Sequence, residues 1–154
     1  MSIEIYPAYN ELDNVRALFT EYAKWLEVDL CFQSFEEELK TLPGLYALPK
    51  GRLYLARYMG ELAGCAALKP AEDNNCEMKR LYVRREYRGH KIGKILIEKI
   101  IDDAKDMKYN TMKLDTLASL KEAISLYRYK GFYETEPYYE NPLENAIFMA
   151  LDLQ

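Results

Sequence analysis

The residues from Leu81 to Lys94 combine basic side chains with glycines in an order that suits anion binding. They read Leu-Tyr-Val-Arg-Arg-Glu-Tyr-Arg-Gly-His-Lys-Ile-Gly-Lys, a strand pattern followed by a basic turn and then the apolar spacing of a helix. A helix start offers free backbone N–H groups and a positive dipole end, and glycines let a backbone approach a ligand closely. The segment therefore predicts a site for phosphate groups.

Two common phosphate-binding motifs do not describe this turn. The Walker pattern needs four residues between its glycines and a Ser or Thr after its lysine, but three residues separate Gly89 from Gly93 and Ile95 follows Lys94. The dinucleotide fingerprint GxGxxG is also absent from the sequence. The anion site must therefore belong to another class.

Charge is unevenly distributed along the 154 residues, which carry a formal net charge of -4. Residues 77–99 hold eight basic side chains against three acidic ones, whereas the remainder holds 13 basic and 22 acidic side chains. An acidic protein with one basic segment is a poor candidate for coating nucleic acid and a good one for a local anion site. We therefore expect no nucleic-acid partner.

Cysteine and histidine usage excludes several other classes. Cys31, Cys65 and Cys76 are 34 and 11 residues apart, which fits neither a disulfide framework nor a CxxC metal clip, and His90 is the only histidine. We expect no metal, a cytoplasmic location and no Ser-His or Cys-His triad that lacks His90. The N-terminus does not resemble a secretory signal, and no apolar run approaches the roughly 20 residues that span a bilayer, so we expect no membrane partner.

Hydrophobic periodicity predicts one α/β (α+β) domain over residues 1–154. Serine–glutamate pairs at Ser34–Glu37 and Ser119–Glu122 have the form of capping boxes, and Gly131 suits a left-handed helix end. Apolar residues change parity between Met78 and Leu81, so a β-bulge near Lys79 or Arg80 is needed to bury both. The expected strands cover residues 3–7, 52–58, 62–68, 76–83, 112–114, 132–135 and 146–153, and the expected helices cover 12–26, 34–42, 92–107 and 119–130.

Two blocks of the sequence resemble the GNAT acyltransferase superfamily. Arg88 and Gly93 take the first and last places of its motif A, Arg or Gln followed by xxGxG/A, although Lys91 stands where the motif has its first glycine. Residues 123–132, Ala-Ile-Ser-Leu-Tyr-Arg-Tyr-Lys-Gly-Phe, look like the family's AxxLYxxxGF signature. The family often has Asn where this chain has Leu120, and Ser119 is a candidate substitute. The two blocks lie within residues 76–132.

The resemblance implies a fold and a co-substrate. The fold is a mixed, mostly antiparallel sheet of six or seven strands with about four helices, in which two parallel strands part to admit acetyl-CoA. The backbone of residues 81–83 would bind the pantetheine arm, and N–H groups of residues 89–94 would bind the pyrophosphate. The implied cofactor-binding residues are Leu81, Tyr82, Val83, Arg88, Gly89, His90, Lys91, Ile92, Gly93, Lys94, Ser119 and Tyr127.

The resemblance also implies catalytic roles. Tyr127 would protonate the departing CoA thiolate, and Glu77 would accept the proton of the acceptor amine, directly or through water. The alternatives are a packed tyrosine and a carboxylate that pairs with Lys79 or Arg80. The implied acceptor-binding residues are Trp25, Phe32, Tyr138 and Tyr139.

The function expected from these features is transfer of an acetyl group from acetyl-CoA to a primary amine of a small molecule or peptide, by direct attack in a ternary complex. A non-catalytic CoA-binding sensor or interaction module is the alternative, because Lys91 and Leu120 depart from the family pattern. Nucleic-acid binding ranks last. The sequence leaves the oligomeric state open, with a homodimer among the alternatives.

Overall fold

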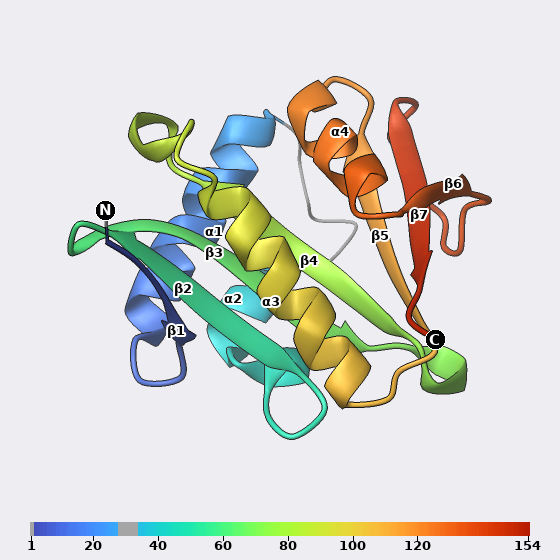
Figure 1. The fold of residues 1–154 in the computed structure, drawn as a ribbon, viewed down its shortest axis with the longest axis horizontal. Coiled ribbons are helices and arrows are strands. Elements are labelled where there is room, and N and C mark those ends of the chain that lie inside the picture. Colours follow the sequence, from blue (N-terminus) through green and yellow to red (C-terminus); the bar gives the residue numbers. More distant parts are fainter. Residues whose placement is uncertain (1, 28–33) are drawn as a thin grey trace.

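A seven-stranded mixed sheet forms the centre of the computed structural model, which describes residues 2–27 and 34–154 (Figure 1). The strand order is β1-β2-β3-β4-β5-β7-β6, and every neighbouring pair is antiparallel except β4 and β5. The sheet confirms the expected fold class. Its strands are β1 (Ile3–Pro7), β2 (Arg52–Tyr58), β3 (Glu61–Pro70), β4 (Cys76–Val83), β5 (Thr111–Leu117), β6 (Tyr133–Thr135) and β7 (Ala146–Asp152).

Helices cover both faces of the sheet. Helices α1 (Leu12–Leu26) and α2 (Phe35–Thr41) lie on one face, and α3 (Ile92–Asp106) crosses the other, with α4 (Lys121–Tyr129) beside β5 on the same side as α3 (Figure 1). Short 3-10 turns at Gly44–Tyr46, Glu72–Asn74 and Arg85–Tyr87 complete the elements of the described chain.

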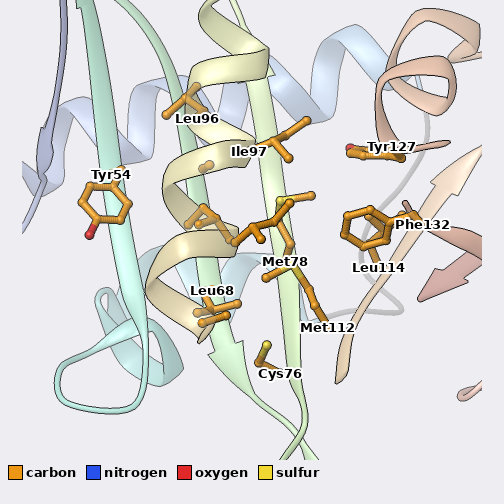
Figure 2. Close-up of a cluster of buried hydrophobic side chains, with 14 of the residues drawn as sticks. Tyr54, Leu68, Cys76, Met78, Leu96, Ile97, Met112, Leu114, Tyr127 and Phe132 are labelled. Carbon is orange, nitrogen blue, oxygen red and sulfur yellow. The ribbon is translucent and has the colours of Figure 1, made fainter. Parts of the chain in front are cut away.

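Because helices cover both faces of the sheet, successive residues of the central strands are buried alternately on one face and on the other. In β2, Leu53 and Leu55 pack against α1, whereas Tyr54 and Ala56 pack on the α3 side. Figure 2 shows the α3-side cluster, in which Tyr127 of α4 lies near Leu114 and Phe132. Burying one large apolar side chain completely, instead of leaving it exposed to water, stabilises the folded state by about 1.5 to 3 kcal/mol.

The expected bulge lies in the middle of β4. Cys65 faces Tyr82 and Ala67 faces Lys79, so two residues of β4 lie opposite one residue of β3. Arg80 takes up the irregularity with φ of 60°. As a result Met78, Leu81 and Val83 pack on the α3 side, while Tyr82 packs against α1.

The two expected capping boxes are wrong, although both helices exist. Ser34 has φ of 56° instead of the extended conformation of a capping residue, and the structure shows no capping hydrogen bond from its side chain within the described residues. Leu120 is the residue that flanks α4, because a backbone bond from Leu120 N–H to Leu117 C=O turns the chain directly into the helix. Gly131 has φ of 103° and ends α4 as expected.

Strands β4 and β5 part soon after they meet. The structure pairs them only at Cys76 with Met112 and at Glu77 with Lys113, within the part of the chain that it describes. Beyond these pairs β4 continues to Val83 beside β3, and β5 continues to Leu117 beside β7. The facing edges therefore carry backbone donors and acceptors that the sheet does not use, which matches the parting implied by the resemblance.

Candidate functional site

A cavity of about 690 Å³ opens between the end of β4, the start of α3 and the start of α4. Many of the residues expected to bind the cofactor line it. The lining residues among them are Leu81, Tyr82, Val83, Arg88, Gly89, Lys91, Ile92, Gly93, Lys94 and Ser119. The fold thus brings the basic turn and the segment before α4 to one cavity.

The turn before α3 keeps a glycine-like backbone where the sequence departs from the family motif. Lys91 flanks the helix with φ of 66°, in the left-handed region, and Gly89 has φ of 91°. Ile95 N–H bonds to Lys91 C=O, so the N–H groups of residues 92–94 form the first turn, in which intrahelical acceptors are lacking. A lysine at this position therefore preserves the helix start that an anion needs.

Arg88 is one of the residues that line the cavity. Its Nε donates a hydrogen bond to the backbone oxygen of Val83 at 2.9 Å, and its guanidinium carbon lies 4.6 Å from the ring centroid of Trp25. Arg84, in contrast, forms a two-point ion pair with Glu21 of α1 at 2.9 and 2.7 Å. These two arginines of the basic segment therefore have different partners: Arg84 pairs with α1, whereas Arg88 borders the cavity.

Two residues expected to bind the cofactor lie elsewhere. His90 stacks on Tyr58 at 4.4 Å between ring centroids, and it is not among the described residues that line the cavity. Tyr127 does not line this cavity either, but it lines a narrower one that continues inward. Leu81, Leu120 and Trp25 border both spaces, so the two cavities adjoin each other beside the gap between β4 and β5.

The inner cavity has a volume of about 70 Å³ and mixes aromatic, apolar and charged walls. Tyr127 is buried, and burial, followed by the nearby Tyr22 and Asp115, raises the pKa of its hydroxyl above the ordinary value. That hydroxyl therefore stays protonated at neutral pH and can donate a hydrogen bond, and the raised pKa makes it a weaker acid than a tyrosine in water. The inner cavity also contains Lys79, Arg80 and Asp115, which come from the facing edges of β4 and β5.

Asp115 is a candidate that the sequence reasoning missed. Its Oδ2 accepts a hydrogen bond from the Tyr139 hydroxyl at 2.6 Å and one from Asn141 Nδ2 at 3.4 Å. A lone aspartate in a strand carries no local motif, and only the pairing of β5 with β7 brings Tyr139 to it. The one available signal was the parity of β5, where Asp115 alternates with the buried Met112 and Leu114.

Glu77 is buried next to two lysines and lies outside the described residues that line either cavity. Its Oε2 accepts a hydrogen bond from the Tyr138 hydroxyl at 3.0 Å, and its carboxylate lies 3.5 Å from Lys69 Nζ and 3.7 Å from Lys79 Nζ. These contacts match the alternative of a carboxylate paired with Lys79. A proton path from the inner cavity to Glu77 would need a relay such as water.

The expected acceptor-binding residues divide into three groups. Trp25 lines both cavities. Tyr138 and Tyr139 contact the site through the carboxylates of Glu77 and Asp115, and their rings pack on Phe148. Phe32 lies outside the described residues. Within residues 2–27 and 34–154, no cluster of three or more His, Cys, Asp or Glu side chains is arranged to hold a metal ion.

No helix in the described ranges is long and apolar enough to cross a membrane. Residues 13–132 match the sequence profile of the acetyltransferase (GNAT) family. An uncharacterized N-acetyltransferase of Schizosaccharomyces pombe is 40% identical over 99% of this chain and 95% of its own length. A second one, from Dictyostelium discoideum, is 36% identical over the full length of both chains.

The fold is shared with solved acetyltransferases. The PaiA N-acetyltransferase of Thermoplasma acidophilum, solved in complex with coenzyme A, superposes with a TM-score of 0.74 over 99% of both chains at 22% identity. At that identity the likeness extends to the fold alone. The parted strands and the cavity described above therefore lie within an architecture that also occurs in a coenzyme A complex.

Proposed function

Because the chain belongs to the acetyltransferase (GNAT) family, we propose that it transfers the acetyl group of acetyl-CoA to a primary amine of a small molecule or peptide. The observation that carries this proposal is the pair of adjoining cavities, one at the start of α3 and one lined by Tyr127, which lie beside the parted strands. A long, thin co-substrate with phosphates at one end and a reactive thioester at the other matches two such cavities, with a helix start at one end and a buried hydroxyl at the other.

The chain's own residues fit acetyl-CoA along these two cavities. The N–H groups at the start of α3, with Arg88, Lys91 and Lys94 beside them, would hold the phosphates. The open edge of β4 at residues 81–83 would bind the amides of the pantetheine arm as a neighbouring strand would. Bound acetyl-CoA supplies an activated acyl carbon and a thiolate leaving group. Ser119 borders the cavity without capping α4, so its hydroxyl is available to the co-substrate.

Tyr127 is the proposed general acid. In the transfer the amine nitrogen bonds to the acetyl carbon, the carbon–sulfur bond breaks, and the sulfur leaves with the electron pair. The Tyr127 hydroxyl donates its proton to that thiolate, and the nitrogen loses one proton to a base. Glu77 remains the predicted base. Because it does not border the inner cavity, it would have to accept the proton through water.

The test pairs Tyr127→Phe with Tyr129→Phe, which removes the hydroxyl of an exposed tyrosine from the same helix. Acetyl-CoA and a panel of lysine, short alkylamines, an arylamine and peptide N-termini would be assayed by thiol release. Tyr127→Phe should lower kcat at least about 100-fold while the Kd for CoA stays unchanged, and Tyr129→Phe should change neither. Full activity of Tyr127→Phe would remove this residue from the mechanism.

The alternative of a CoA-binding module without catalysis makes a different prediction. It expects tight acetyl-CoA binding with no acyl transfer to any amine above the rate in buffer. The backbone of Lys91 weakens one reason for this alternative, because the lysine adopts the conformation that a glycine would provide.

A further inference from the structure

Asp115 is one of the residues that line the inner cavity, and two neighbouring side chains hold its carboxylate in place. Tyr139 donates to its Oδ2 at 2.6 Å, and Asn141 Nδ2 contacts both that oxygen and the Tyr139 hydroxyl, at 3.4 and 3.0 Å. These partners are neutral donors. None of the ion pairs found among residues 2–27 and 34–154 includes Asp115.

The cations on the opposite wall already have carboxylate partners. Arg80 is held by two contacts to Glu38, and Lys79 Nζ lies 3.7 Å from Glu77. Burial lowers the pKa of the Lys79 ammonium, and the negative charges of Glu77 and, more weakly, Asp115 oppose that shift. Among the described residues that line the cavity, Asp115 is the only carboxylate, and it has no ion-pair partner there.

The remaining walls suit an alkylammonium group. The rings of Tyr22, Trp25 and Tyr127 border the cavity, and ring faces attract cations, by about 0.5 to 2 kcal/mol in desolvated sites. The other described lining residues are mostly apolar, with Thr116 as the one uncharged polar residue among them. A volume of about 70 Å³ holds roughly five water-sized atoms at one probe sphere per atom, so a short unbranched chain fits this space more readily than a bulky group.

We propose that Asp115 binds the ammonium group of the acceptor and that Tyr139 positions Asp115, so that the acceptor is a cationic amine on an unbranched alkyl chain. This inference rests on the proposed function, because it assigns the acceptor end of the same site. The carboxylate would hold the amine as its ammonium form, which would release one proton to water before the free amine attacks. The second nitrogen proton would pass to the base after the carbon–nitrogen bond forms. The apolar and aromatic walls would take the alkyl chain.

The test uses CoA thioethers that need no knowledge of the natural acceptor. S-aminopropyl-CoA places an ammonium beyond the sulfur, S-butyl-CoA places a neutral chain of equal length there, and S-carboxyethyl-CoA places a negative charge. Titration calorimetry on the full chain should show S-aminopropyl-CoA binding about tenfold more tightly than S-butyl-CoA, as expected for one charge-assisted hydrogen bond.

Three variants test whether the preference for S-aminopropyl-CoA over S-butyl-CoA comes from Asp115. Asp115→Asn should abolish the tenfold preference and leave S-butyl-CoA binding unchanged, and Tyr139→Phe should reduce the preference to about threefold, since Asn141 still holds the carboxylate. The matched control is Asp152→Asn, which removes an exposed carboxylate that also accepts a tyrosine hydroxyl, from Tyr133 at 3.1 Å. The control should keep the full preference.

The outcomes separate this inference from the function on which it rests. Equal binding of the two chains to the wild type, tighter binding of S-carboxyethyl-CoA, or a preference that survives Asp115→Asn would overturn the ammonium site while leaving CoA binding intact. Failure of CoA and of every thioether to bind the wild type would overturn the proposed function and this inference together. If Asp115→Asn does not fold, the reduced preference of Tyr139→Phe decides the matter.

Discussion

Arg80 and Glu38 form a two-point ion pair that ties the bulge of β4 to α2. Arg80 Nε and Nη2 lie 3.0 and 2.9 Å from the two carboxylate oxygens, and the guanidinium carbon lies 5.2 Å from the ring centroid of Phe35. Arg80 is buried and has φ of 60°. The pair therefore holds the residue at which β4 changes face, and after that change Leu81 and Val83 line the larger cavity.

Removing the Glu38 charge should destabilise the fold. Glu38→Gln leaves a buried guanidinium with a weaker partner, which costs about 3 kcal/mol, the low end for a broken buried pair because contacts of Arg80 with aromatic rings remain. Urea unfolding measures the loss. The matched variant Glu36→Gln removes an exposed carboxylate from the same helix and should change stability by less than about 0.5 kcal/mol. Equal losses in the two variants would show that the ion pair does not hold the bulge.

Most of the sheet and all four α-helices of the described chain could be predicted because their signals are local. The parity change between Met78 and Leu81 even located the bulge, since only an extra residue can bury both. The capping boxes failed because a serine–glutamate spacing does not set backbone conformation. Ser34 is left-handed, and a backbone turn from Leu117 to Leu120 starts α4 without Ser119.

The part of the candidate site at the turn before α3 could be located from the sequence, whereas the part around Asp115 could not. The glycines and arginines of the turn before α3 lie within one short segment, so their pattern can be read in sequence. Asp115 and Tyr139 are 24 positions apart and meet only through strand pairing. Glu77 was proposed as the base from the family resemblance, but the direction of its side chain depends on Tyr138 and two lysines that no local pattern specifies.

The left-handed Lys91 predicts a stabilising substitution. The left-handed conformation destabilises the folded state by about 1 to 2 kcal/mol for a residue with a Cβ. Glycine avoids this cost, but its greater freedom in the unfolded chain lowers stability by about 0.4 to 1 kcal/mol. Lys91→Gly should therefore raise the free energy of unfolding by about 0.5 kcal/mol in urea titration. A clear loss of stability would mean that the lysine side chain contributes more to the fold than its backbone costs.

Gly89 provides the opposite test in the same turn. Its φ is 91°, and a Cβ built there would meet nothing within 4 Å, so the cost of a side chain is conformational alone. Gly89→Ala should lower the free energy of unfolding by about 1 kcal/mol. If Gly89→Ala were neutral, the turn would be free to adopt another backbone conformation.

The two described cysteines should be unreactive in the folded protein. Burial raises the pKa of Cys76 to about 12 and that of Cys65 still further above its ordinary range, and the thiolate is the reactive form. In a Cys31→Ser variant, an aromatic disulfide reagent at mildly alkaline pH should label no thiol in buffer and two in urea. Fast labelling in buffer would show that the sheet opens around these residues.

The raised pKa values of Cys65 and Cys76 predict that the free energy of unfolding falls as the pH becomes alkaline. The folded chain binds the protons of Cys65 and Cys76 more tightly than the unfolded chain does, so the stabilisation is fully present below about pH 9, the ordinary value for a thiol. It should be lost progressively as the pH rises above that value. Urea unfolding of the Cys31→Ser variant between neutral and alkaline pH measures this fall, and a Cys76→Ala variant should show a smaller one.

The two roles open to Glu77 predict different kinetics. As a structural carboxylate it neutralises Lys69 and Lys79, so Glu77→Gln should cost about 3 kcal/mol in urea unfolding with kcat unchanged. If Glu77 is the base, Glu77→Gln should also lower kcat. The decrease of kcat toward acidic pH that is expected of the wild type should then be absent from the variant. Tyr138→Phe keeps the charge and removes one hydrogen bond, so it should cost about 1 kcal/mol and leave kcat unchanged. A folded Glu77→Gln enzyme with wild-type kcat would exclude Glu77 as the base.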